Sequence, residues 1–118
     1  MADESKKDES KKKEGNFATP DMIAQWKRKY GEVFEFSHCY DAAAQKYYVG
    51  YFHKPDISVL SNSMRFTDTN PMKAKEIVFN GCKLQCDKEM TEDVEIYLPL
   101  LMQVNALLQF KLVEVKNC

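Results

Sequence analysis

The stretch GEVFEFSHCYDAAAQKYYVGYFHKPD, residues 31–56, decides the fold. Apolar and polar residues alternate over residues 33–38, which is typical of a half-buried strand. Residues 46–53 are aromatic and β-branched, a composition that favours a second strand. Asp41 can hold a turn between the two runs through its side chain, so the stretch predicts an antiparallel hairpin. Gly50 indicates a bulge or a close approach by another backbone.

A hairpin alone is only marginally stable in water, so other segments must cover it. Thr19 and Pro20 suit the start of a helix and Gly31 suits its end, which predicts a helix just before the hairpin. Apolar spacings of three and four residues predict further helices after it. Their expected ranges are 57–65, 71–84 and 94–110. The expected fold class is therefore α+β, with an N-terminal helix, one antiparallel hairpin and about three covering helices.

Three local features complete this prediction. Residues 85–93 are polar and are expected to be a connector, and residues 111–118 form either a last helical turn or an edge strand. Asn80-Gly81 is expected to weaken the helix that contains it. Pro99 is tolerable in the last helix if that helix begins near residue 93 or 95, because first-turn amides have no partner within a helix.

Length and composition restrict the class of protein. A chain of 118 residues has room for one domain, which we place at residues 17–118, after a charged tail at residues 1–16 that is expected to be disordered. The net charge of −1 gives no basic excess, so nucleic acid is not an expected partner. No apolar run is long enough to span a membrane, and none near the N-terminus predicts a signal peptide. The four cysteines are then expected to be reduced thiols in a cytosol.

A metal site is the sharpest candidate for chemistry. Cys82 and Cys86 are one helical turn apart, and His38-Cys39 or His53 would have to complete the ligand set. Adjacent residues of a strand point to opposite faces, so this set is a poor match to zinc. The acidic run at residues 87–95 is typical of a solvated helix start and lacks the turn glycine of a calcium loop. There is no glycine-rich phosphate loop and no recognisable nucleophile motif. We therefore expect no metal, no cofactor and no enzymatic activity.

The segment 94–110 is apolar on most of its sides when drawn as a helix. Such a helix either lies at the centre of the core or contacts a partner. Methionine suits an adaptable contact surface. The candidate partner-binding residues are Met64, Met90, Leu101, Met102, Val104 and Leu108. The alternative, that this helix is simply core, stays open.

Three motifs follow one another in the chain: W-K-x-K-Y-G-x-V-F-E-F at residues 26–36, K-P-D at 54–56, and D-x-N-P-x-K-x-x-E-I-V-x-N-x-C at 68–82. Over about residues 20–110, this order resembles small proteins encoded in the tail-morphogenesis region of tailed phages and prophages, the tail assembly chaperone families. The chain departs from them in its charged N-terminal tail and in its unusually apolar last helix.

The resemblance implies a non-enzymatic role. Such chaperones keep the long helical tape-measure protein soluble and help tail-tube subunits polymerise around it, so the implied partners are the tape-measure protein, the tail-tube protein, or both. The implied location is the cytoplasm of the bacterial host. The alternative is a structural subunit of the phage tail or head–tail connector, which would form a homo-oligomer in the virion. A small regulatory binding module is a third class.

Overall fold

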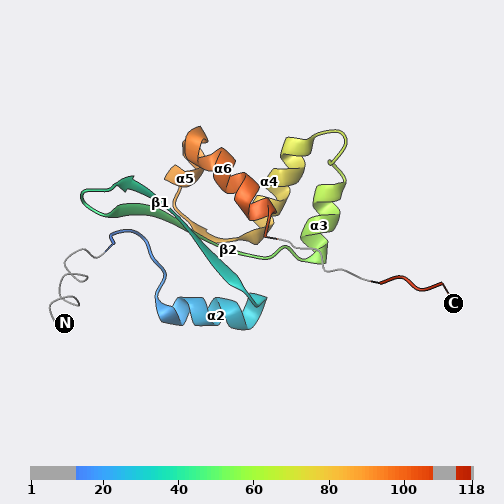
Figure 1. Ribbon diagram of the computed structural model, residues 1–118, viewed down its shortest axis with the longest axis horizontal. Coiled ribbons are helices and arrows are strands. Elements are labelled where there is room, and N and C mark those ends of the chain that lie inside the picture. Colours follow the sequence, from blue (N-terminus) through green and yellow to red (C-terminus); the bar gives the residue numbers. More distant parts are fainter. Residues whose placement is uncertain (1–12, 108–113, 118) are drawn as a thin grey trace.

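The computed structural model describes residues 13–107 and 114–117, which form an α+β fold (Figure 1). Its sheet has three antiparallel strands in the order β1-β2-β3. These are β1 Val33–Asp41, β2 Lys46–His53 and β3 Lys83–Cys86. The predicted hairpin is confirmed, and its first strand runs three residues further than the predicted end at residue 38.

The hairpin turn and the register follow from particular residues. The Asp41 carboxylate accepts a hydrogen bond from the Ala44 amide at 3.1 Å, as its position in the sequence predicted. Phe36 lies opposite Gly50. A Cβ atom on Gly50 would lie 3.0 Å from the Phe52 ring and 3.2 Å from Cys86 Sγ, so the close approach at this glycine is made by side chains and not by the backbone that the sequence predicted.

The helices cover the sheet unequally. α3 Ile57–Met64, α4 Pro71–Cys82, α5 Glu89–Glu92 and α6 Val94–Asn105 lie on one side, and α2 Pro20–Tyr30 lies on the other (Figure 1). The main core lies between the sheet and the larger group of helices. It contains Phe52, Val78, Phe79, Cys82, Met90, Leu100, Leu101 and Val104. Phe52 of β2 meets Phe79 of α4 with ring centroids 5.0 Å apart.

The second layer of packing lies beneath α2. Tyr51 of β2 is buried there and Val49 is buried next to Gly15, although α2 itself contributes no buried residue. Trp26 packs against Tyr51 with ring centroids 5.4 Å apart, and Tyr30 stacks on His53 at 4.2 Å. α2 is therefore attached to the sheet mainly by aromatic contacts.

Side-chain caps explain where three helices begin. Thr19 accepts a hydrogen bond from the Met22 amide, Asp56 from the Val59 amide and Asn70 from the Lys73 amide. Each cap satisfies an amide that has no partner within its own helix. Gly31 ends α2 with a φ of 87°, a conformation that glycine adopts without a steric penalty. The predicted positions of these helix starts are confirmed.

A third strand was missed by the sequence analysis. α4 ends at Cys82 and not at residue 84, and Lys83–Cys86 then pairs with β2. The predicted connector at residues 85–93 therefore contains the end of β3 and the short helix α5. β3 pairs with backbone groups along one edge of β2 that would otherwise be unpaired. A strand of four residues is too short for its periodicity to reveal this pairing in the sequence.

The predicted boundary of the N-terminal tail is wrong at its end. Glu14 forms a parallel bridge to Lys46: its amide donates to the Gln45 carbonyl and its carbonyl accepts from the Tyr47 amide, both at 2.8 Å. A Cβ atom on Gly15 would lie 2.7 Å from the Tyr47 carbonyl oxygen, so this position needs glycine. Residues 13–16 thus belong to the sheet region, and residues 1–12 lie outside the described residues.

The last predicted helix is shorter than expected. α6 ends at Asn105. Residues 108–113 and 118 lie outside the described residues, and residues 114–117 have no regular secondary structure. Pro99 is the sixth residue of α6, so it lies beyond the first turn and the predicted reason for its tolerance is wrong. In the described part of the chain, no helix is long and apolar enough to cross a membrane.

Candidate protein-binding surface

α6 has a buried side and an apolar exposed side. Leu100, Leu101 and Val104 are at most 4% exposed. On the other side, Val94, Leu98 and Met102 are 60%, 43% and 56% exposed. These three residues, the α6 stripe, are spaced four apart and therefore lie one above another along the helix.

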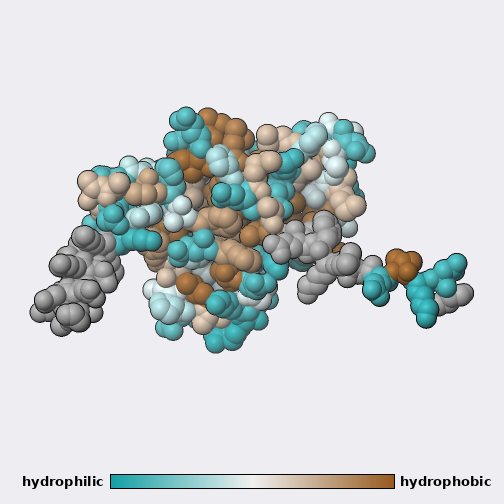
Figure 2. Space-filling model, viewed as in Figure 1, coloured by the Kyte–Doolittle hydropathy of each residue, from teal (hydrophilic) through white to brown (hydrophobic). Residues whose placement is uncertain are grey.

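The α6 stripe is exposed on the surface of the molecule. Figure 2 shows hydrophobic residues gathered at the top of the molecule, where Figure 1 places one end of α6. Tyr97 packs edge-on against Phe79 of α4 with ring centroids 5.3 Å apart, and Asn105 Nδ2 donates to the Lys75 carbonyl at 3.2 Å. These contacts hold α6 against α4 at both ends, so the stripe is presented on a fixed helix.

Negative charge surrounds the first turn of α6. Asp93 accepts a hydrogen bond from the Glu95 amide at 3.0 Å, which caps the helix. Within residues 13–107 and 114–117, no ion pair neutralises Glu89, Glu92 or Glu95. Burial raises the pKa of the nearby Tyr48 hydroxyl, and the charge of Glu89 raises it further. The stripe thus has an acidic end beside Val94.

The structure separates the six predicted partner-binding residues. Met90, Leu101 and Val104 are at most 2% exposed and belong to the core, so they do not reach a partner while the chain is folded. They are buried because they lie on the sides of α5 and α6 that pack in one core cluster with Phe52 and Phe79. The other three are Met102, which lies on the α6 stripe, Met64, which is 71% exposed on α3, and Leu108, which lies outside the described residues.

Two residues of the surface were missed. Val94 and Leu98 lie on the stripe beside Met102, but they were absent from the predicted set. Their spacing of four was visible in the sequence. This spacing did not identify the surface, because another side of the same helix is equally apolar. Periodicity therefore did not show which side faces the sheet.

The cysteines do not form a reactive or metal-binding cluster among the residues that the structure describes. No group of three or more His, Cys, Asp and Glu side chains is placed there to hold a metal ion. Cys82 is buried, and burial raises the pKa of its thiol to about 11. Cys86 Sγ lies 4.0 Å from Met90 Sδ, against the core. These thiols are protonated at neutral pH, which makes them poor nucleophiles.

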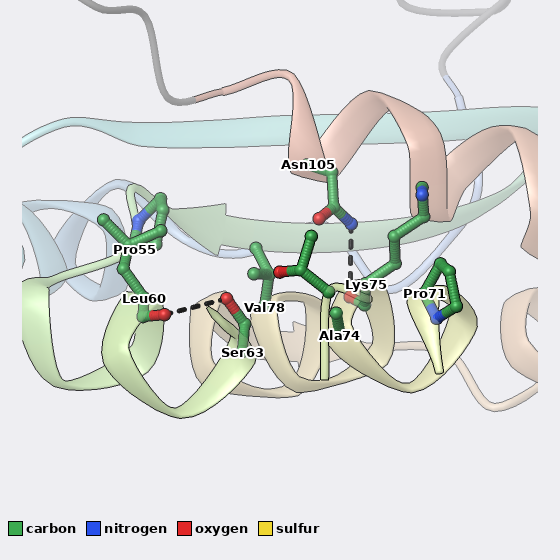
Figure 3. A pocket seen from close by; sticks show the side chains of 9 residues that line it. Pro55, Leu60, Ser63, Pro71, Ala74, Lys75, Val78 and Asn105 are labelled. Atoms are coloured by element: carbon green, nitrogen blue, oxygen red, sulfur yellow. Dashed lines mark hydrogen bonds between the residues drawn. The ribbon is translucent and has the colours of Figure 1, made fainter. Parts of the chain in front are cut away.

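A cavity of about 290 Å³ lies between α3 and α4, and Figure 3 shows the residues that line it. Two of its polar side chains are already hydrogen-bonded: Ser63 Oγ donates to the Leu60 carbonyl at 2.9 Å, and Asn105 donates to the Lys75 and Leu101 carbonyls. Small-molecule sites usually enclose roughly 300–1,000 Å³ and aim a few free polar groups at the ligand. The cavity is therefore better explained as imperfect packing between helices.

The arrangement offers an apolar strip with an acidic end, on a helix held firmly in place. This combination suits contact with an amphipathic helix, in which apolar anchors recur every three or four residues. Comparison of the chain with protein-family models, with characterised proteins and with solved structures gave no match.

Proposed function

We propose that this protein is a non-enzymatic assembly factor that binds amphipathic helices of another polypeptide. In the setting that the sequence resemblance implies, it is a tail assembly chaperone-like protein. Its partners are then the tape-measure protein, tail-tube subunits, or both, and it acts in the cytoplasm of the bacterial host. The observation that carries the proposal is the exposed stripe of Val94, Leu98 and Met102 on a helix whose other side is core.

The size of the stripe fits one short helical contact. Met102 lies eight positions after Val94, which corresponds to about 12 Å along the helix axis at roughly 1.5 Å per residue. A partner helix covers this length with about two turns. Its apolar side would otherwise be exposed and prone to aggregate before assembly, so covering that side keeps the partner soluble.

The charge beside the stripe restricts the orientation of the partner. Glu89, Glu92 and Glu95 lie near one end of α6 only. A partner helix with Lys or Arg next to its apolar anchors gains favourable electrostatic contacts in one direction and loses them when reversed. Rim charges of this kind mainly accelerate association and select the orientation.

A structural subunit of the phage tail or head–tail connector is the second candidate. The observation in its favour is the position of β1 at an edge of the sheet, where a further strand can be added. Mass spectrometry of purified particles separates the two functions. A chaperone is absent from mature virions, whereas a structural subunit is present in many copies.

The binding proposal is tested with peptides that tile the tape-measure and tail-tube proteins of the same phage genome. Their affinity for the full chain is measured by fluorescence anisotropy. We expect Leu98→Asp to weaken binding at least roughly tenfold, because it places a charge in a desolvated contact. Ile57→Asp is the matched control, because Ile57 is 83% exposed on a different helix, α3. Equal loss in both variants, or no binding by the unmodified chain, contradicts the proposal.

A further inference from the structure

The outer edge of β1 is open in the part of the chain that the structure describes. The strand order β1-β2-β3 gives β1 a neighbour on one side only. The opposite edge of β2 is filled by β3 and by Glu14, but no described segment forms backbone hydrogen bonds with the outer side of β1. β1 is nine residues long, more than twice the four residues of β3. An edge of this length is a template for another strand.

The register shows which backbone groups point outward. Tyr47 and Val49 bond to Glu14 and Asp87, on the side of β2 away from β1. Because backbone groups alternate along a strand, Tyr48, Gly50 and Phe52 must bond to β1. Their partners there are the even-numbered residues of β1, namely His38, Phe36 and Phe34. The N–H and C=O groups of the odd-numbered residues of β1 therefore point outward: Val33, Glu35, Ser37 and Cys39.

β1 also carries little of the usual protection against strand addition, because the irregularity in its register lies at its end, between Cys39 and Asp41. Its sequence, VFEFSHCYD, contains no proline, lysine or arginine. Natural sheets commonly place such residues on exposed edges to prevent pairing with other chains. The carboxylate of Glu35 accepts a hydrogen bond from Tyr51 Oη at 2.7 Å, so it is directed toward β2 and not toward an incoming strand. The edge is therefore available for pairing.

We propose that a second copy of this chain pairs with β1, antiparallel, about a twofold axis at Ser37. This register overlaps the whole of β1. Because the twofold axis is perpendicular to the sheet, the same face of β1 lies on the same side of the joined sheet in both copies. The register places Phe36 opposite His38 of the second copy and Phe34 opposite Tyr40 of the second copy. Aromatic side chains then meet across the interface on the side covered by α6, and such cross-strand pairs are stabilising. The two acidic residues of β1 face Cys39 and Val33 of the second copy and do not face each other.

A hollow next to β1 provides space for the incoming side chains. It measures about 190 Å³, lies between β1 and α6, and is lined by Phe36, Ser37 and His38 together with Pro99 and Gln103. A strand added at the outer edge of β1 places its aromatic residues beside this hollow. The two three-stranded sheets then join into one six-stranded sheet, which has no open β1 edge.

Sedimentation velocity of the full chain over a wide concentration range tests the proposal. We expect a species of twice the 13.7 kDa chain mass. Ser37→Pro removes one outward N–H from each copy and none of the hydrogen bonds to β2, so it should weaken the dimer roughly tenfold or more. Ser37→Thr keeps the N–H and is the control. Circular dichroism of both variants checks that they keep the fold.

Hydrogen exchange locates the interface. The amides of Glu35, Ser37 and Cys39 should become protected as the concentration of unmodified chain rises. Leu98→Asp should leave the dimer unchanged, which separates this proposal from the binding function of α6. A monomer at every concentration overturns the proposal. So does a dimer that survives Ser37→Pro unchanged, or concentration-independent protection of these three amides, which would mean that the same chain covers the edge.

Discussion

Gly81 of α4 lies directly against Val59 of α3: a Cβ atom on Gly81 would come within 2.6 Å of Val59 Cγ2. The absence of a side chain at residue 81 allows the two helices to approach closely. In the sequence alone, this glycine predicts only a weaker helix. Its position shows that the weakening is offset by helix packing.

We predict that Gly81→Ala destabilises the protein by about 1–3 kcal/mol, because the added methyl group overpacks the contact with Val59. Helix propensity alone predicts a gain of about 1 kcal/mol, so the sign of the change distinguishes the two effects. Adding Val59→Ala should make Gly81→Ala much less harmful, since the clashing methyl groups are gone. Urea unfolding of the two single variants and the double variant measures this coupling. A Gly81→Ala protein that is more stable than the unmodified chain contradicts the packing argument.

Tyr51 joins three segments of the chain. Its hydroxyl donates to Glu35 Oε1 at 2.7 Å and accepts from the Ala18 amide at 2.9 Å. Burial, helped by the bond to Glu35, raises the pKa of the hydroxyl to about 12. An unfolded tyrosine ionises near a pKa of about 10. The folded state therefore holds this proton more tightly than the unfolded state does.

Stability is then predicted to fall as the pH rises from about 10 to about 12, because only the unfolded chain loses the Tyr51 proton in this interval. Below pH 10 the contribution is fully present. Tyr51→Phe should cost about 1–2 kcal/mol at neutral pH and should reduce the alkaline loss. Tyr40→Phe changes an exposed tyrosine and is the control, so this variant should lose stability at alkaline pH as the unmodified chain does. Melting temperatures across this pH range test the prediction, which fails if both variants have the slope of the unmodified chain.

Leu101 and Met102 are neighbours in sequence, but Leu101 is 1% exposed and Met102 is 56% exposed, so they lie on the buried and the exposed side of α6. We predict that Leu101→Ala destabilises the protein by about 2–5 kcal/mol, because it removes packing from the core. Met102→Ala should change stability by less than about 0.5 kcal/mol. Chemical denaturation compares the two. A similar cost at both positions would show that the α6 stripe is covered in solution.

Asp87 fastens the N-terminal segment to the sheet. Its carboxylate accepts from the buried Val49 amide at 2.8 Å and from Asn16 Nδ2 at 2.6 Å. Asp87→Ala leaves the Val49 amide without its acceptor, so we expect a loss of about 1–3 kcal/mol. Hydrogen exchange should also rise at Glu14 and Tyr47. Asp68→Ala, at an exposed position, is the control and should have neither effect.

The fold class was predictable because its main signals are local. The alternation in β1, the aromatic run of β2 and the caps at Thr19 and Asp56 depend on residues a few positions apart. β3 was not predictable in this way. Its sequence K-L-Q-C alternates, but four residues are too few to distinguish a strand from a connector, and it is a strand because β2 offers it unpaired backbone groups.

The candidate surface was only partly predictable for a related reason. The sequence identified α6 as unusually apolar, and the structure resolves its two apolar sides into core and surface. Leu101 and Leu98 have the same side chain, but Phe52 and Phe79 lie on the side of Leu101. Which side of such a helix is buried depends on contacts between distant segments, and helical spacing alone does not contain that information.

Pro99 lies inside α6 and is expected to destabilise this helix. It cannot donate to the Glu95 carbonyl, and an interior proline usually costs about 3 kcal/mol relative to alanine. We predict that Pro99→Ala stabilises the protein by about 1–3 kcal/mol, since Pro99 is exposed and its loss leaves no cavity in the core. Gln103→Ala, one turn further along α6, is the control and should stay within about 0.5 kcal/mol.

The same variant connects helix geometry to binding. Pro99 directly follows Leu98 of the α6 stripe, and an interior proline commonly bends a helix, so we expect its replacement to change the angle between Leu98 and Met102. If the stripe binds a partner helix in its present shape, Pro99→Ala should be more stable and yet bind several-fold more weakly in the peptide titration. Greater stability with unchanged affinity would show that the proline has no role in the contact. Lower stability would show instead that α6 needs the proline ring for packing against the hollow beside β1.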